Sequence, residues 1–311
     1  MKTIPTTSES DWLEKRRVTG VGASEAAILC GVGRFKSEYQ LWLEKLGLDK
    51  EDARYAEQSK WGHLLEDPIA AAYEDETGRK TMKPPPGTLY CDEEHPFMLC
   101  TLDRWQTIDP GDKFYQTQEA LTKSLVVPLE IKTAHWNLKG NWKEEPPIEY
   151  VIQVQHQLAV TGAPVGSVAA LVGGMMFLWC DVSRDDEFIA QLRTIEGEFW
   201  RKCEQRIAPA VDGSEQTKKA LARLYAQDTG EIISFPATLL EADNLREQAS
   251  KELDRWTEEK RLAENQIRAA LGAASAGTFP NGVTYTLKLQ HRKETVQKAT
   301  SFRVLRRLGA K

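Results

Sequence analysis

Cysteine and histidine are scarce in this sequence, with five residues of each in a chain of 311. The cysteines are scattered, odd in number and never spaced as C-x-x-C, which argues against a disulfide framework, a zinc site or an iron–sulfur cluster. No apolar run is long enough to cross a bilayer, and residues 1–10 lack the charged and apolar regions of a signal peptide. We therefore expect a cytoplasmic protein with no membrane segment.

Positive charge is also limited, because the formal net charge of the chain is -5 at pH 7. Such a protein is not a general polyanion binder, so any contact with nucleic acid requires a local concentration of basic residues. One concentration stands near the C-terminus, where only Glu294 opposes a set of basic side chains: Lys288, Arg292, Lys293, Lys298, Arg303, Arg306, Arg307 and Lys311. This tail is either a solvated end or a nucleic-acid contact.

The remaining composition is that of an ordinary globular protein, with 41% hydrophobic and 28% charged residues. Hydrophobic patterning predicts a core domain over residues 1–209 and a C-terminal accessory region over residues 210–311. The core has the pattern of an α/β (α+β) fold, with a central mixed β-sheet flanked by helices. The accessory region contains a long helix with one apolar seam over residues 239–271 and a β-hairpin around Asn281-Gly282, followed by the basic tail.

Within the core, apolar periodicity and capping residues predict helices at residues 11–17, 24–30, 38–46, 53–77, 148–160 and 185–207. Short runs rich in aliphatic residues predict strands at residues 88–91, 96–105, 125–133, 167–172 and 176–182.

The strand at residues 125–133 carries the most informative pair of charges. Glu130 and Lys132 are separated by one apolar residue and therefore project from the same face of the strand. Asp103 closes the preceding predicted strand, and the two strands are expected to be antiparallel neighbours. Two carboxylates and a lysine would then meet at one end of the sheet.

Each of these residues has an ordinary structural interpretation as well. An isolated E-x-K is more often an ion pair at a strand end, Glu66 on its helix is more often solvated, and Ser24 is more often a helix cap. The functional interpretation makes Glu130 an oxygen ligand for Mg²⁺, Lys132 a group facing a water or a phosphate, and Ser24 part of an anion site at a helix start.

Several separated motifs together resemble a known family. The order Asp103, Glu130-Ile131-Lys132 resembles the PD-(D/E)xK nuclease signature, with Leu102 where that signature often has proline. More narrowly, the chain is similar to the YqaJ-type viral recombinases, the group that includes phage λ exonuclease. Five motifs carry this similarity: Arg17-x5-Ala23-Ser24, Trp61-Gly62-x3-Glu66, Leu102-Asp103, Glu130-Ile131-Lys132 and Tyr150-x2-Gln153-x-Gln155.

The resemblance implies roles for particular residues. Asp103 and Glu130 would ligate Mg²⁺, with Mn²⁺ able to substitute, and Glu66 would face the metal directly or through water. Lys132 would activate the attacking water and Gln153 would help to place it. Arg17 and Ser24 would hold the 5′-phosphate of the strand being digested.

The resemblance also implies an activity and partners. It predicts a Mg²⁺-dependent, processive 5′-to-3′ exonuclease that degrades linear double-stranded DNA and leaves 3′ single strands for a single-strand annealing protein. Such an enzyme would be encoded by a phage or prophage and would work in the bacterial cytoplasm as a ring-shaped homo-oligomer, with a trimer favoured. The alternatives are an endonuclease of the same fold and a non-catalytic DNA-binding scaffold.

Two departures from the family stand close to the predicted site. Asp103 is followed by Arg104 and Trp105, where many relatives have glycine and a small or apolar residue, so the turn after the metal ligand is expected to differ. His63 lies one turn before Glu66 and is interpreted as a helix-surface residue, since Glu66 fits the family spacing.

Overall fold

The computed structural model describes residues 1–49, 56–112, 124–142, 146–291, 303 and 305. The chain forms two compact units, residues 1–225 and residues 226–311, and each is described here by itself. The boundary predicted at residue 209 falls earlier in the chain than this division. Helix α7 (Glu215–Leu224) lies within the first unit, where it buries Thr217 and Ala220 and where the Thr217 hydroxyl donates to that of Ser37.

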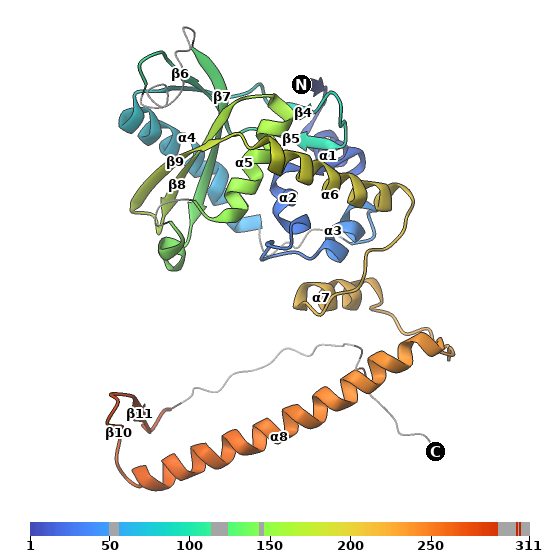
Figure 1. Ribbon diagram of the computed structural model, residues 1–311, viewed down its shortest axis with the longest axis vertical. Coiled ribbons are helices and arrows are strands. Elements are labelled where there is room, and N and C mark those ends of the chain that lie inside the picture. Colours follow the sequence, from blue (N-terminus) through green and yellow to red (C-terminus); the bar gives the residue numbers. More distant parts are fainter. Residues whose placement is uncertain (50–55, 113–123, 143–145, 292–302, 304, 306–311) are drawn as a thin grey trace. The chain divides into compact units, whose positions relative to one another are not determined.

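A five-stranded mixed sheet forms the centre of the first unit (Figure 1). Its strands, in spatial order, are β3 (Lys80–Met82), β6 (Arg104–Ile108), β7 (Leu125–Ala134), β8 (Val165–Val172) and β9 (Met176–Ser183). Strands β7 and β8 are parallel, whereas the other neighbours are antiparallel. The long strand β7 lies in the middle because its aliphatic residues are buried on both faces.

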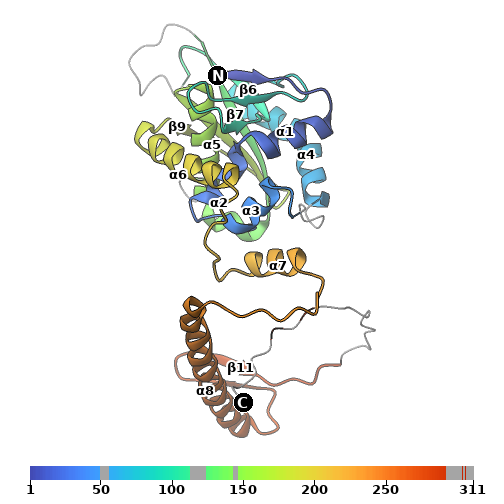
Figure 2. The ribbon, with the colours of Figure 1, turned by 90° about the vertical axis from the view of Figure 1, so that its right-hand side faces the viewer.

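Helices cover both faces of this sheet. Figure 2 shows β7 between α4 (Ala56–Thr77) and α5 (Ile148–Thr161). Helix α4 contributes its buried face to one core with β7 and β8, comprising Ile69, Ala70, Tyr73, Leu129, Ile131 and Ala169. Helix α5 contributes Ile152, Val154 and Leu158 to the core that also holds Val165 and Val168. The predicted fold class, a central mixed sheet flanked by helices, is confirmed.

A second sheet lies beside the first and has the order β1 (Lys2–Ile4), β4 (Leu89–Cys91), β5 (Met98–Cys100) and β2 (Val21–Gly22). The continuous strand predicted over residues 96–105 is wrong, because the chain leaves β5 in this sheet and enters β6 in the other. Residues 101–103 form the crossing and make no strand. Asp103 is therefore the last residue before β6.

The remaining helices of the first unit follow the predicted segments closely. They are α1 (Glu9–Thr19), α2 (Ala23–Leu29), α3 (Glu38–Lys45) and α6 (Asp186–Glu204). Side-chain caps explain several of their beginnings, since Ser8, Ser37 and Asp185 each accept a hydrogen bond from the first turn. The predicted start of α4 at residue 53 lies outside the described residues.

The second unit contains the predicted long helix and hairpin. Helix α8 (Leu240–Leu271) follows a short 3-10 turn (Ala237–Leu239), and β10 (Ala276–Thr278) pairs antiparallel with β11 (Thr284–Thr286). Gly282 adopts φ 86°, as the turn between these strands requires. Most of the basic tail lies outside the described residues. Among the described residues, no helix is both long enough and apolar enough to cross a membrane.

Candidate active site

The register between β6 and β7 brings the predicted acids together. Arg104 stands opposite Leu129 in the antiparallel pair, so Asp103 lies beside the next residues of β7. Asp103 Oδ2 accepts a hydrogen bond of 2.8 Å from the backbone N–H of Ile131. The strands after Asp103 and around Glu130 are antiparallel neighbours as expected, but Asp103 precedes β6 instead of closing a strand.

Glu130 is buried, with 4% of its surface exposed, and both of its oxygens are engaged. Oε1 lies 2.6 Å from Lys132 Nζ and accepts a hydrogen bond of 2.6 Å from Gln153 Nε2. Oε2 accepts a hydrogen bond of 2.6 Å from Gln157 Nε2. Two glutamines one turn apart on α5 and a lysine two residues along β7 therefore fix the orientation of this carboxylate, which offsets the cost of burying it.

Lys132 completes a closed set of contacts with Glu130 and Gln153. Its Nζ donates to Gln153 Oε1 at 2.8 Å and lies 5.2 Å from the centre of the Tyr150 ring. Burial alone lowers the pKa of this ammonium, but the negative charges of Glu130 and Asp103 outweigh it and raise the pKa above the ordinary value. Lys132 is consequently a fixed positive charge that can position a water or balance charge on a phosphate.

The surroundings of Asp103 disfavour its charged form, because the neighbouring side chains of Glu130 and Glu66 are also negative. Burial, followed by the negative charge of Glu130, raises the pKa of the Asp103 carboxyl well above its usual range, and Glu66 adds to this effect. Lys132 and the Ile131 N–H only partly offset it. Two carboxylates that repel each other in a buried site form a hard oxygen donor set that suits Mg²⁺ or Mn²⁺.

Glu66 lies near Asp103 and Glu130, but its own side-chain contacts are with His63 and Arg104. Its Oε1 is 2.8 Å from His63 Nδ1, and its Oε2 is 3.6 Å from Arg104 Nη1. Within the described ranges, no three His, Cys, Asp or Glu side chains form a group arranged to hold a metal ion. Asp103 and Glu130 are the two carboxylates that could hold a metal at this position, with Glu66 as a nearby charge. His63 is on the helix surface, as predicted, with 76% of its side chain exposed.

Arg104 contributes to the site in a way that the sequence did not predict. Its side chain is 4% exposed, its Nη1 donates to the Asp103 carbonyl oxygen at 2.6 Å, and its Nη2 donates to the Asp67 carboxylate. The guanidinium therefore connects the backbone at Asp103 to the turn of α4 that carries Glu66. The sequence marked Arg104 only as a departure from the family at the turn after Asp103, and it held no local signal for these contacts.

Gln157 is a second residue that the sequence analysis passed over. It is fully buried and stands four residues after Gln153, which places both amides on one face of α5. This spacing was the available signal. Gln155, which belongs to the family motif, instead faces the start of α6, where its amide bonds the Ser183 carbonyl and the Asp185 N–H.

Arg17 and Ser24, the predicted phosphate-binding pair, are not in contact. Arg17 Nη2 lies 2.6 Å from Glu14, and its Nη1 donates to the Lys45 carbonyl oxygen. The Ser24 hydroxyl accepts a hydrogen bond of 2.6 Å from Nη2 of Arg16. Arg16 rather than Arg17 is therefore the arginine that contacts the start of α2, where its Nη2 also lies 3.9 Å from Glu25 Oε1.

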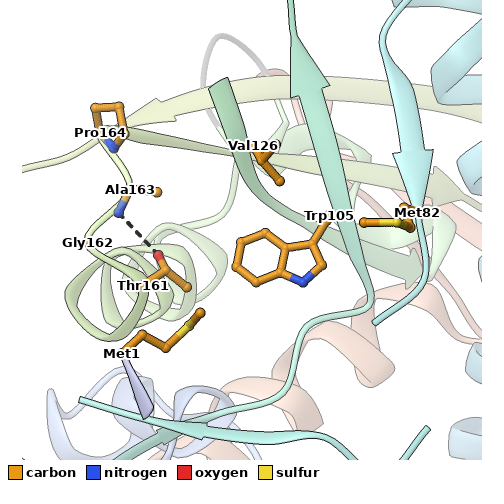
Figure 3. A pocket seen from close by; sticks show the side chains of 8 residues that line it. All are labelled: Met1, Met82, Trp105, Val126, Thr161, Gly162, Ala163 and Pro164. Atoms are coloured by element: carbon orange, nitrogen blue, oxygen red, sulfur yellow. Dashed lines mark hydrogen bonds between the residues drawn. The ribbon is translucent and has the colours of Figure 1, made fainter. Parts of the chain in front are cut away.

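A hollow of about 480 Å³ lies elsewhere in the first unit (Figure 3). Its lining comes from the two sheets and the end of α5, and consists of Met1, Met82, Trp105, Val126, Thr161, Gly162, Ala163 and Pro164. No side chain in this lining carries a charge, and none of the predicted site residues belongs to it. The hollow is thus separate from the Asp103 and Glu130 site.

The fold and the site together define an α/β protein in which an aspartate precedes one strand and an E-x-K motif stands on its antiparallel neighbour. A family model described as YqaJ-like viral recombinase domain matches residues 11–164. The uncharacterized protein YqaJ of Bacillus subtilis (strain 168) is 31% identical over 279 residues, which cover 88% of this chain and 82% of that protein. The chain belongs to the YqaJ-like viral recombinase family.

Similar solved structures include an alkaline exonuclease, LHK-Exo from Laribacter hongkongensis, at 20% identity and a TM-score of 0.44. Its complex with dAMP gives 22% identity and a TM-score of 0.45, and each match covers 69% of this chain and 99% of the other. The structure of SSO0001 matches at 14% identity with a TM-score of 0.32, covering 64% of this chain and 94% of the other.

Proposed function

We propose that this protein is a divalent-metal-dependent deoxyribonuclease that degrades linear double-stranded DNA from its ends. The observation that carries the proposal is the contact set in which Lys132 Nζ and Gln153 Nε2 both reach Oε1 of Glu130, with the Asp103 carboxylate held beside them by the Ile131 N–H. A half-buried lysine held beside two carboxylates is suited to hydrolysing a phosphodiester with a bound metal ion. Membership of a viral recombinase family supports DNA as the substrate.

In this proposal Asp103 and Glu130 hold Mg²⁺, or Mn²⁺ in its place, and Glu66 adds negative charge from α4. When bound, the metal supplies Lewis-acid polarisation of the phosphate and a lowered pKa for a coordinated water. Lys132 places its positive charge beside the scissile phosphate, because it is anchored by Glu130 and Gln153. Gln153 fixes the direction of both charged groups through the two ends of its amide.

We further propose that digestion runs 5′ to 3′ and processively, with Arg17 and Ser24 holding the 5′-phosphate and Arg16 assisting through its bond to Ser24. The product would be a 3′ single strand for an annealing protein in phage-type recombination. Processivity is best served by a ring-shaped homo-oligomer, with a trimer favoured.

The test is incubation of the full chain with Mg²⁺ and end-labelled linear duplex DNA that carries either a 5′-phosphate or a 5′-hydroxyl, with closed circular DNA alongside. We expect shortening of the linear duplex, faster from 5′-phosphorylated ends, and intact circles. Cleavage of circles would make the protein an endonuclease of the same fold.

The variant Lys132→Ala should lose at least 100-fold in cleavage rate while binding DNA normally. The exposed Lys80→Ala should change neither the rate nor the binding. Wild-type protein that binds DNA and never cuts it would identify a scaffold.

A further inference from the structure

Helix α8 presents apolar side chains that nothing in its own unit covers. None of its 32 residues is buried, and Leu245, Leu253 and Trp256 are each more than half exposed. A helix this long with an apolar stripe on an otherwise charged surface is typical of a helix that packs along a partner.

The stripe has a mirror arrangement along the sequence, centred on Trp256. Ala242, Leu245 and Ala249 stand 14, 11 and 7 residues before Trp256, and the equivalent positions after it are also apolar: Ala263, Ile267 and Ala270. In a symmetric antiparallel pair of identical helices, a residue before the centre meets the residue at the same distance after it. Each apolar position of this stripe would therefore meet an apolar position.

The sizes of these residues also suit two helices lying close together. Alanine recurs at positions 242, 249, 263 and 270, with Trp256 at the seven-residue position between them. A seven-residue repeat keeps one seam in contact over the length of a left-handed pair, and small side chains in the seam let the helix axes approach. Leu253 is the exception to the mirror, since it would meet Glu259.

Charge selects the antiparallel direction. The first half of α8, residues 240–254, carries five acidic and two basic side chains, whereas residues 255–271 carry four basic and three acidic ones. A parallel pair would align the acidic halves with each other. An antiparallel pair brings the acidic half of one helix, with a net charge of -3, against the weakly basic half of the other, with a net charge of +1. Beside the seam it sets Glu252 opposite Lys260 on both sides of the centre, whereas the like-charged mirror pairs Asp254–Glu258 and Lys251–Arg261 fall on the outer face.

We propose that α8 is a self-association helix, which pairs antiparallel with α8 of a second copy of this chain about a two-fold axis at Trp256. The apolar stripe forms the seam, and the two Trp256 side chains meet at its centre. A two-fold contact cannot repeat around a three-membered ring, so in a trimeric assembly this pairing joins protomers of two different rings. It is independent of the site built by Asp103 and Glu130, and it holds whether or not the protein cleaves DNA.

Cysteine cross-linking in the full chain tests the pairing and its direction. Leu245 and Ile267 are 22 residues apart and thus about 33 Å apart along one helix, so a disulfide between them in the double variant Leu245→Cys/Ile267→Cys must join two chains. We expect peptide mass spectrometry after mild oxidation to identify the 245–267 linkage. Linkages 245–245 and 267–267 instead would indicate a parallel pair and overturn the proposal, as would no linkage at all.

The matched control is Lys251→Cys/Arg261→Cys, whose positions are equally spaced about Trp256 but lie on the outer face of α8. We expect no cross-link from this variant at the same protein concentration. If it cross-links as efficiently as the seam variant, the contact is random collision and the proposal fails.

Sedimentation gives a second measurement on the unmodified chain. Trp256→Asp places a charge in the seam and should lower the mass of the assembly, whereas Asn244→Asp adds the same charge on the outer face and should leave the mass unchanged. Circular dichroism should show equal helix content in both variants. An unchanged mass for Trp256→Asp, with the helix intact, would mean that α8 does not join protomers.

Discussion

Lys132 Nζ lies 2.6 Å from Oε1 of Glu130, its neighbour but one on β7. The amide of Gln153 bridges the two groups, donating to the carboxylate and accepting from the ammonium. This arrangement fixes which end of the amide carries the oxygen, because only one orientation satisfies both charges. The three side chains form one unit, and removal of any member changes the positions of the other two.

Because these three side chains act together, the effects of substituting two of them on the cleavage rate should be non-additive. Lys132→Met and Gln153→Leu should each reduce single-turnover cleavage of linear duplex DNA by at least 100-fold, and the double variant should be little slower than the slower single one. Residues acting independently would give effects that multiply. Lys132→Met combined with the surface change Lys80→Met serves as the control, because the exposed Lys80 is paired with Glu74 on α4, outside the site, and should add nothing.

Gln157 should separate stability from catalysis when compared with Gln155. Both amides are buried on α5, but Gln157 holds Oε2 of Glu130 whereas Gln155 bonds backbone groups near α6. Gln157→Met and Gln155→Met should each lower the free energy of unfolding by about 1–3 kcal/mol, the cost of a buried group left without its partner. Only Gln157→Met should also slow cleavage at saturating Mg²⁺. Equal cleavage rates for the two variants would remove Gln157 from the site.

Arg104 is expected to affect both the stability of the fold and the affinity of the site for Mg²⁺. Its guanidinium bonds the Asp103 carbonyl and Asp67 and lies 3.6 Å from Glu66. Arg104→Met should destabilise the fold by about 1–3 kcal/mol and lower the Mg²⁺ concentration needed for half-maximal cleavage, because the loss of a positive charge beside Glu66 makes the site more negative. Lys83→Met is the matched control, since Lys83 also pairs with Asp67 but is exposed, and it should have effects within about 0.5 kcal/mol.

The two arginines of α1 should be separable by their effects on end recognition. Arg16 holds the Ser24 hydroxyl and Arg17 is paired with Glu14, so we expect Arg16→Ala to reduce the preference for 5′-phosphorylated over 5′-hydroxyl ends as much as Arg17→Ala does. A phosphate contact of this kind is worth about 1.5–3 kcal/mol, or tenfold and more in preference. Glu14→Ala frees Arg17 without removing a cation and should leave the preference intact. If Arg16→Ala has no effect, the arginine at Ser24 is only structural.

The sequence predicted those parts of the site that depend on local alternation along a strand. Glu130 and Lys132 share a face because side chains alternate every two residues, and Asp103 joins them because consecutive antiparallel strands are usually neighbours. The crossing at residues 101–103 was missed, since apolar residues continue on both sides of it and the change of sheet leaves no local mark. The position of Arg104 depends on how α4 approaches β6, which no short-range pattern encodes.

The contact of Ser24 with Arg16, and not with Arg17, has a similar cause. Helix α1 has no buried residue, so its sequence contains no apolar face that would fix its rotation. Adjacent positions on a helix differ by about 100° in direction, and spacing along the chain alone could not choose between them. The family motif supplied the position of an arginine and the tertiary contacts of α1 decided which one reaches Ser24.

Asp103 gives a prediction about stability that has an unusual sign. Its pKa is raised in the folded protein, chiefly by burial and then by the charge of Glu130. Between the unfolded and the folded pKa the native state binds more protons than the unfolded state, so this group makes the free energy of unfolding fall as pH rises. At pH values above both the unfolded and the folded pKa, the charged Asp103 lowers the free energy of unfolding by its full amount. Asp103→Asn removes the charge and keeps an oxygen for the Ile131 N–H, so it should abolish cleavage and yet stabilise the protein at pH 7 and above.

Denaturant unfolding from pH 4 to pH 8, with and without Mg²⁺, measures this effect. Without metal, wild-type stability should fall with increasing pH more steeply than that of Asp103→Asn, by up to about 1.4 kcal/mol per pH unit inside the titration window. Added Mg²⁺ should stabilise the wild type at pH 8, where the carboxylate is available, much more than at pH 5, where protons compete for it. Asp103→Asn should gain little from Mg²⁺ at either pH. Parallel pH profiles for the two proteins would show that the pKa of Asp103 is not raised in the folded protein, and equal stabilisation by Mg²⁺ would show that Asp103 is not a ligand.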